Sequence, residues 1–441
     1  MISGASFSSA GEVFSWLESF SNFEKTAFAL RNFRLDRMEA LLEHFGRPHR
    51  ACRSVHIAGS KGKGSTAAFL ASVLRAAGFK TGLYTSPHLV SYKERISLAG
   101  EEIPDGVFVR QGETLKATLE SLDASRFPGG ELPTTFELLS CLGFLIFRHL
   151  GCEWVVLETG MGGRLDATNV CLPQAVVLTP IELEHTEYLG ATIAAIAGEK
   201  AGIIKKGIPV FVGPQTGEAL CVFRAHAARK GCRLRYLPEC FQSITSHTDS
   251  GGTWARMLPA GRETPLGLRL RLRGEVQAEN AALAFLAIRD ILPQIPENTV
   301  LRGLQEADIP GRFQKLGDSP PVFIDGSHTP LSVTRLLHSF REIYPRPDTL
   351  VLGIVGGKRQ EEIASILCPA FRRVIVTTPG TFKASDPRRL HEICSAHNAN
   401  ASLVPDPAEA LAQAKKGLPG PDCPILVTGS FYLAGEILKL P

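Results

Sequence analysis

Residues 55–66, V-H-I-A-G-S-K-G-K-G-S-T, contain the pattern that decides the fold. A short apolar run breaks into glycines at Gly59, Gly62 and Gly64, and apolar residues then recur at steps of three and four until Gly78. This order predicts a strand, a tight turn and a helix. Such a turn can cradle phosphate, because glycine lets backbone N–H groups approach the anion and the helix N-terminus adds partial positive charge.

Lysine and hydroxyl side chains complete this predicted phosphate loop. Lys63 supplies a point charge, and Ser65 or Thr66 supplies a hydroxyl near a metal. The spacing differs from the common G-x-x-x-x-G-K-[ST] pattern, because Gly64 stands between the lysine and the serine. The loop favours a nucleoside triphosphate over the alternative, a flexible turn with a solvated lysine pair.

The composition is that of an ordinary globular protein. With 441 residues, 44% of them hydrophobic and 21% charged, the chain can bury at least one full core and form two or three domains. Its net charge of +4 is spread without a basic block, so nucleic acid is not an expected partner, whereas anionic small substrates are.

The ten cysteines are scattered without any C-x-x-C pair, which predicts reduced thiols in a cytoplasmic protein. The N-terminus has no basic region followed by an apolar run, so a secretory signal is not expected. No stretch approaches eighteen uninterrupted apolar residues, so a membrane span is not expected either.

Strand and helix patterns alternate along most of the chain. Residues 10–46 and 276–291 have helical patterns, 134–149 is apolar on nearly every face and predicts a buried helix, and 245–274 predicts antiparallel strands. After a linker near residue 307, short apolar runs alternate with helical segments again. We therefore predict an α/β fold with two parts. Residues 1–306 form a mostly parallel sheet domain with the phosphate loop, and residues 307–441 form a smaller, Rossmann-like α/β domain.

Three polar residues follow predicted strands in the same half as the phosphate loop. Glu158 ends the run W-V-V-L-E, His185 follows the run A-V-V-L-T-P, and Ser86 stands in the turn after K-T-G-L-Y. Parallel neighbouring strands would bring these ends together, because ligands of such sheets lie outside the carboxyl ends of the strands. A carboxylate, an imidazole and a hydroxyl can hold Mg²⁺ against nucleotide phosphates. Taken singly, the alternatives are a helix-capping serine, a surface glutamate and a hydrogen-bonded loop histidine.

Two further patterns are weaker. Lys200, in G-E-K-A-G-I-I-K, has by pattern alone the features of a helix lysine that pairs with a neighbouring glutamate. Asp325 and His328 follow a predicted strand in the second half and would face a ligand crevice.

Several motifs together are similar to a known family. G-S-K-G-K-G-S-T, Y-T-S-P-H-L, E-T-G-M-G-G-R-L-D-A-T-N-V, H-T-E-Y-L-G, G-E-K-A-G-I-I-K, P-G-R-F-Q, D-G-S-H-T-P and G-S-F-Y-L-A-G-E occur in the order and near the spacing found in folylpolyglutamate synthases and dihydrofolate synthases. These enzymes belong to the Mur ligase superfamily. The resemblance extends from about residue 10 to the C-terminus, and it implies that the phosphate-loop domain resembles the central domain of Mur ligases.

The resemblance implies a role for each matching residue. The implied nucleotide-binding residues are Gly59, Gly62, Lys63, Gly64, Ser65, Thr66, Asn280 on the adenine side, and Arg312 and Asp325 at phosphate and ribose. The implied magnesium ligands are Ser86, Glu158, His185 and Lys200, the last after carbamylation. The implied catalytic residues are Lys63, Lys200 and His328.

The family's chemistry implies the cofactors and partners. ATP phosphorylates a substrate carboxylate, and the amine of glutamate attacks the acyl phosphate to form an amide. The expected cofactors are ATP, two magnesium ions and a monovalent cation. The expected partners are dihydropteroate or folate and L-glutamate, bound by a cytoplasmic monomer.

Some positions differ from the family's usual motifs. Lys61 adds a cation in the phosphate loop, while Glu182 adds a carboxylate and Glu184 lengthens another beside the predicted magnesium site. Thr135 replaces a frequent aromatic residue near the pterin pocket, and Gly357-Lys358-Arg359 replaces D-K-D.

Two alternatives therefore stay open. One is a related amide ligase that acts on another acid or amine. The other is a nucleotide-binding regulatory module without turnover, although a pure binder does not need the second metal site that Lys200 implies.

Overall fold

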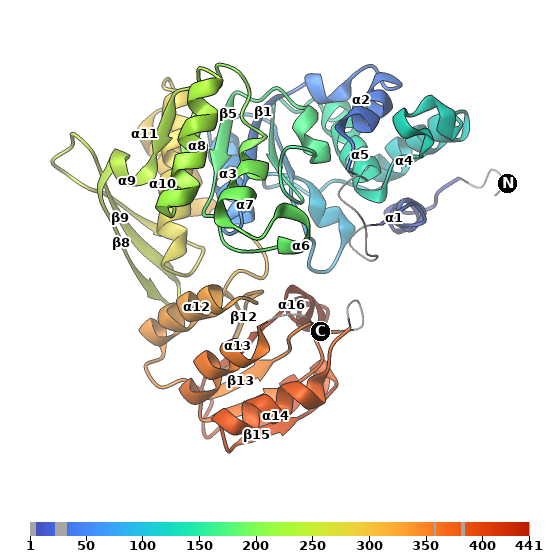
Figure 1. The fold of residues 1–441 in the computed structure, drawn as a ribbon. Coiled ribbons are helices and arrows are strands. Elements are labelled where there is room, and N and C mark those ends of the chain that lie inside the picture. The colour runs from blue at the N-terminus through green and yellow to red at the C-terminus, as the bar shows by residue number, and fades with distance from the viewer. Residues whose placement is uncertain (1–5, 23–32, 357–358, 381–383, 441) are drawn as a thin grey trace. The chain divides into compact units, whose positions relative to one another are not determined.

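The computed structural model describes residues 6–22, 33–356, 359–380 and 384–440 (Figure 1). These residues form two compact units. The first comprises Met1–His88, Tyr92–Gln242 and Asn280–Leu304, and the second comprises Leu89–Ser91, Ser243–Glu279 and Gln305–Pro441. The assignment of ATP and folate binding to residues 1–306 stays a prediction.

The first unit is built on a seven-stranded sheet in which only β3 is antiparallel to its neighbour. In sheet order its strands are β3 (Ile96–Leu98), β2 (Thr81–Tyr84), β4 (Trp154–Glu158), β1 (Arg53–Ala58), β5 (Ala175–Leu178), β6 (Val210–Val212) and β7 (Leu234–Tyr236). Its helices are α1 (Ala10–Glu18), α2 (Leu35–Glu43), α3 (Lys63–Ala76), α4 (Asp105–Glu120), α5 (Thr135–His149), α6 (Thr186–Leu189), α7 (Ile193–Ala201), α8 (Gly217–Arg229), α9 (Leu237–Cys240), most of α10 (Val276–Ile291) and α11 (Glu297–Glu306).

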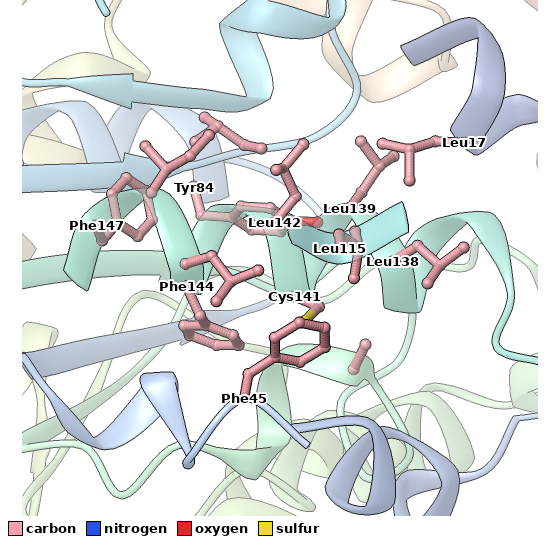
Figure 2. Close-up of a cluster of buried hydrophobic side chains, with 14 of the residues drawn as sticks. Leu17, Phe45, Tyr84, Leu115, Leu138, Leu139, Cys141, Leu142, Phe144 and Phe147 are labelled. Atoms are coloured by element: carbon pink, nitrogen blue, oxygen red, sulfur yellow. The ribbon is translucent and has the colours of Figure 1, made fainter. Parts of the chain in front are cut away.

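Both faces of this sheet are covered, as the apolar strands require. Helix α3 contacts β1, β2 and β4. A large buried cluster joins α1, α2, α4 and α5 to β2 and β4, and Figure 2 shows Tyr84, Leu142, Phe144 and Phe147 in it. A second cluster joins α7 and α8 to β5 and β6. The predicted buried helix over 134–149 is α5, which begins with a capping box at Thr134.

The second unit contains a six-stranded sheet and a three-stranded antiparallel sheet. The larger sheet has the order β11 (Gln314–Asp318), β12 (Pro321–Ile324), β16 (Ile425–Thr428), β13 (Thr349–Leu352), β14 (Arg373–Val376) and β15 (Ala401–Leu403), and only the β11–β12 pair is antiparallel. The smaller sheet has the order β10 (Leu266–Leu270), β9 (Gly252–Pro259) and β8 (Phe241–Asp249).

Helices cover both faces of the larger sheet. One buried cluster joins it to α12 (Pro330–Ile343), α13 (Gln360–Leu367) and α14 (Pro387–His397). Another joins it to α15 (Pro407–Lys416) and α16 (Phe431–Leu438). The predicted α/β fold, with a mostly parallel phosphate-loop sheet and a smaller Rossmann-like sheet, is confirmed, and so are the antiparallel strands within 245–274.

Two sequence predictions concern the helical pattern near the N-terminus and the cysteines. The helical pattern over 10–46 is realised as α1 and α2, and the part of it over 23–32 lies outside the described residues. All ten cysteines are described, and each is a free thiol. No helix in the described part of the chain is long and apolar enough to cross a membrane.

Candidate functional site

The phosphate loop joins β1 to α3 through a left-handed glycine. Gly62 has φ +84° and caps α3, which begins at Lys63. Gly59 has φ +152°, and a Cβ on it would lie 1.8 Å from Oγ1 of Thr179. The amides of Ser60 and Lys61 donate to the carbonyl of Pro180 at 2.9 and 3.2 Å. These contacts fix the loop, and the N-terminus of α3 offers backbone N–H groups and its dipole to an anion.

Two lysines meet at one carbonyl of this loop. The ammonium groups of Lys63 and Lys200 donate to the Gly59 oxygen at 2.9 and 2.7 Å. Lys200 also pairs with Glu184 at 3.0 Å, and only 2% of its side chain is exposed. The neighbour Glu199, the partner that the helix pattern suggested, instead pairs with Arg164 at 2.9 Å.

Burial and mutual attraction decide the charges of this pair. Burial, together with the smaller effect of the Lys63 charge, lowers the pKa of Lys200 to about 8 against the opposing attraction of Glu184. Burial alone would raise the pKa of Glu184, but the charges of Lys200, Lys63 and Lys61 hold that pKa at about 2. The carboxylate therefore stays ionised, and it faces three cations.

Ser86 and Glu158 come together at the carboxyl ends of β2 and β4, which are parallel neighbours. The amide of Ser86 donates to the Glu158 carboxylate at 3.2 Å, and Glu158 is only 3% exposed. His185 follows β5 with a left-handed backbone, φ +48°, and is adjacent in sequence to Glu184. Because β2, β4, β1 and β5 are consecutive in the sheet, the predicted strand ends lie along one edge.

A metal centre is not visible in the acidic and imidazole side chains alone. The described residues contain no group of three or more histidine, cysteine, aspartate and glutamate side chains that could hold a metal ion. The predicted set of Ser86, Glu158, His185 and Lys200 contains only two such side chains, so the magnesium site stays a prediction.

Asn280, on α10, lies against the phosphate loop. Its Oδ1 accepts from the Thr66 hydroxyl at 3.4 Å, and a Cβ on Gly62 would lie 2.6 Å from the same atom. Asn280 therefore contacts the start of α3, while its predicted role on the adenine side is untested.

The second unit holds its candidate residues in one loop system. Both carboxylate oxygens of Asp325 accept backbone N–H groups, from Phe313 at 2.8 Å and from Ser327 at 2.7 Å. Phe313 has φ +46°, a conformation that a bulky side chain adopts only when its surroundings impose it. Asp325 therefore shapes the loop that carries Arg312.

The ring of Phe431, which the sequence analysis did not single out, packs against Arg312 and His328. The Arg312 guanidinium lies 4.1 Å from the ring centre of Phe431, and the His328 ring packs edge-on at 5.8 Å. Gly326 leaves room for the ring, because a Cβ there would lie 2.6 Å from it. Phe431 belongs to the quoted motif G-S-F-Y-L-A-G-E, and an aromatic residue in a motif was the available signal.

Several residues that differ from the family motifs make contacts with their surroundings. The Thr135 hydroxyl donates to the carbonyls of Leu17 and Phe20 at 3.0 and 3.1 Å, so it ties α5 to the segment around α1. Arg359 pairs with Glu362 in the first turn of α13. Two more departures, Gly357 and Lys358, lie outside the described residues. The backbone carbonyl of Glu182 accepts from the Ser60 hydroxyl at 3.2 Å.

Comparison with known proteins identifies the family. A family model described as "Mur ligase, glutamate ligase domain" matches residues 311–431. Over 433 residues the chain is 34% identical to folylpolyglutamate synthase of Lacticaseibacillus casei, and the match covers 97% of both chains. The chain belongs to the folylpolyglutamate synthase and dihydrofolate synthase family. The predicted family membership is thereby confirmed, and the chain is an enzyme of the Mur ligase superfamily.

Two further relatives of this family enzyme extend the comparison. The Bacillus subtilis dihydrofolate synthase/folylpolyglutamate synthase is 32% identical over 419 residues, which cover 92% of this chain and 94% of the relative. A solved structure of E. coli FolC in complex with DHPP and ADP superimposes with a TM-score of 0.84 at 27% identity and covers 99% of this chain and 98% of that one.

Proposed function

We propose that this enzyme uses ATP to join L-glutamate to dihydropteroate, to a folate, or to both. The γ-phosphoryl group passes to the carboxylate of the acceptor, which gives an acyl phosphate and ADP. The amine of glutamate then attacks the acyl carbon, an amide bond forms, and phosphate and a proton leave. The relatives named as synthases, and the E. coli protein solved with DHPP and ADP, support this proposal.

The observation that carries the proposal is the convergence of two lysines on the phosphate loop. Lys63 and Lys200 donate to the same Gly59 carbonyl at the N-terminus of α3. An incoming triphosphate carries several negative charges, so it can take over the ammonium group of Lys63 from a neutral carbonyl, and it can attract that of Lys200 only until Lys200 becomes a carbamate. Gly62, Gly64 and Ser65 then offer donors at the same end of the helix, where the dipole favours an anion, and the Thr66 hydroxyl can join them by leaving Oδ1 of Asn280.

Magnesium fits the oxygen donors beside this loop. Glu158 and Ser86 are adjacent, and a carboxylate and a hydroxyl are the hard oxygen ligands that Mg²⁺ prefers. His185 completes the proposed first set. When bound, the ion would neutralise phosphate charge and polarise the transferred phosphoryl group.

Lys200 as an ammonium ion does not fit a second metal, but its carbamate does. The neutral amine adds to CO₂ and releases a proton, which replaces a cation by an anion with two oxygen donors. The ion pair with Glu184 would separate in that step, because both partners would then be negative. A monovalent cation beside these anions belongs to the same proposal.

The second unit supplies residues for the nucleotide and for the amine. In this proposal Arg312 contacts the phosphates and Asp325 faces the ribose, while Asn280, which belongs to the first unit, lies on the adenine side. His328 is the proposed catalytic residue near the incoming amine. We further propose that the enzyme acts as a monomer in the cytoplasm.

Turnover with a panel of acids tests the reaction. With ATP and magnesium, phosphate release should require both L-glutamate and either a pteroate or a folate, and the product mass should rise by one glutamyl residue. Turnover with an unrelated acid alone would point to the alternative amide ligase. No turnover with any acid would point to a binding module.

Substitution of Lys200 tests the carbamate. We expect Lys200→Ala to abolish turnover and a short carboxylate such as acetate to restore part of it, since the missing negative charge would then come from solution. Lys206→Ala is the matched control, because it also replaces a lysine by alanine and because Lys206 is exposed and lies five residues after the last residue of α7. Full activity of Lys200→Ala would refute the role.

A further inference from the structure

The loop that follows Glu158, residues 159–169, packs against the helix that carries Lys200. Its Arg164 amide donates to the carbonyl of Glu199 at 2.9 Å, and the Arg164 guanidinium binds the Glu199 carboxylate at 2.9 and 3.1 Å. The buried amide group of Asn169 donates to the carbonyl of Gly202 at 3.3 Å, just after the end of α7. The loop is therefore hydrogen-bonded to the last turn of α7, which contains Lys200.

Two glycines allow the backbone of the loop to contact the backbone at the end of α7 directly. A Cβ on Gly163 would lie 2.9 Å from the Glu199 carbonyl and 3.0 Å from the Lys200 carbonyl. A Cβ on Gly202 would lie 2.5 Å from Cα of Arg164 and 2.9 Å from its backbone nitrogen. Side chains at either position would push the loop and the helix apart, because contacts under 3.0 Å with backbone atoms cannot be relieved by a rotamer change.

The loop is held rigid within itself. The buried carboxylate of Asp166 accepts the amides of Gly160 at 2.9 Å, Met161 at 3.1 Å and Thr168 at 3.0 Å. Asn169 also donates to the carbonyl of Arg164 at 2.9 Å, which closes the far end of the loop. We therefore expect a displacement at Gly163 to move the whole 159–169 loop rather than one residue.

We infer that the 159–169 loop is a spacer that sets the position of Lys200 relative to Glu158, with Gly163 and Asn169 as positioning residues. The loop begins at the carboxylate of Glu158 on β4 and ends against the turn that carries Lys200 on α7. This inference rests on the proposed function, in which Glu158 would hold the first magnesium ion and the Lys200 carbamate the second. Neither positioning residue needs to touch substrate, because each acts through the backbone of the loop or of α7.

The test compares two glycine-to-alanine variants that lie near the same helix. Gly163→Ala places a methyl group into the contact, whereas Gly198→Ala adds the same methyl group on α7, where nothing lies within 4 Å. We expect Gly163→Ala to lower kcat by about 10- to 100-fold, because displacements near 1 Å have effects of that order, and to leave KM for ATP within about twofold. Added bicarbonate should restore part of the loss. Gly198→Ala should keep wild-type kcat and bicarbonate dependence.

A second readout does not depend on turnover. Hydrogen exchange of the peptide covering 193–204 should be faster in Gly163→Ala than in wild type and unchanged in Gly198→Ala. If the proposed reaction is absent, wild type itself will show no ligation, while the exchange difference will persist. A folded Gly163→Ala protein with wild-type kcat and wild-type exchange would overturn the inference.

A milder variant covers the case in which Gly163→Ala does not fold. Arg164→Gln removes a pair whose side chains are 56% and 26% exposed, so it should leave the fold intact. We expect a fall of about two- to fivefold in kcat, since one of several contacts to α7 is lost, together with faster exchange of the same peptide. Wild-type values for both measurements in Arg164→Gln would overturn the inference.

Discussion

The buried histidine of β1 makes the stability of the first unit depend on pH. His56 is fully buried, its Nε2 lies 2.8 Å from Oγ1 of Thr168, and its Nδ1 has no hydrogen-bond partner. The Thr168 hydroxyl donates to Asp166, so the neutral ring carries its proton on Nε2 and donates to the Thr168 oxygen. Burial, and then the charge of Lys205, lower the pKa of His56 to about 3 from an ordinary value of 6.5.

The sign and the size of the effect follow from this shift. Because the folded pKa lies below the unfolded one, the unfolded state binds more protons between pH 6.5 and pH 3, so stability is full above pH 6.5 and falls as the pH drops through this window. For one fully buried group with these pKa values, the loss between pH 7.5 and pH 5.0 is about 2 kcal/mol. His56→Gln should remove it, since the glutamine amide can donate to Thr168 and does not titrate.

Urea unfolding at pH 7.5 and pH 5.0 measures the difference. Wild type should lose about 2 kcal/mol more than His56→Gln between the two pH values. Other groups that titrate in this range, such as His49 with its pKa lowered to about 4 by burial, are present in both proteins and cancel. Equal losses in both proteins would refute the reasoning, because the buried ring would then take up a proton at no cost to the folded state.

Three further substitutions have defined outcomes. Phe431→Leu keeps an apolar contact but removes the ring under Arg312, so kcat/KM for ATP should fall about three- to tenfold in steady-state assays while the unfolding midpoint stays the same. Arg37→Ala leaves the buried Glu137 carboxylate without its 2.9 Å partner and should cost about 3–5 kcal/mol in urea unfolding, most of it recovered when Glu137→Gln is added. Thr135→Val loses the two carbonyl contacts and should cost about 1–3 kcal/mol with an unchanged KM for the acceptor, and a raised KM would instead place this residue in the acceptor pocket.

Local patterns predicted the parts of the fold in which the chain's own backbone determines the conformation. The strand, left-handed glycine and helix around Gly62 follow from residues that are adjacent in sequence. The nearness of Ser86 and Glu158 also followed, since parallel strands that end in polar residues share an edge. The motifs were specific enough to predict the family before any comparison.

Long-range contacts could not be predicted in the same way. The helix pattern suggested that Lys200 pairs with a neighbouring glutamate, but tertiary packing brings Glu184 to it and Arg164 to Glu199. The sequence also predicted Asp325 as a ligand-facing residue and gave no sign that both its oxygens hold backbone amides. These contacts join residues whose separation in sequence carries no periodic signal.

The arrangement of charge at the phosphate loop bears on the role proposed for Lys200. Lys61, Lys63 and Lys200 act on the single carboxylate of Glu184, so this corner is positive before any ligand arrives and suits a triphosphate. Carbamylation of Lys200 would change that residue from +1 to −1, which removes the surplus of positive charge that these four groups offer to the phosphates. Divalent cations would then be needed to hold the same anion. An enzyme whose Lys200 stays an ammonium ion should therefore bind nucleotide without magnesium but fail to transfer the phosphoryl group. The enzyme with carbamylated Lys200 should need magnesium both for nucleotide binding and for phosphoryl transfer.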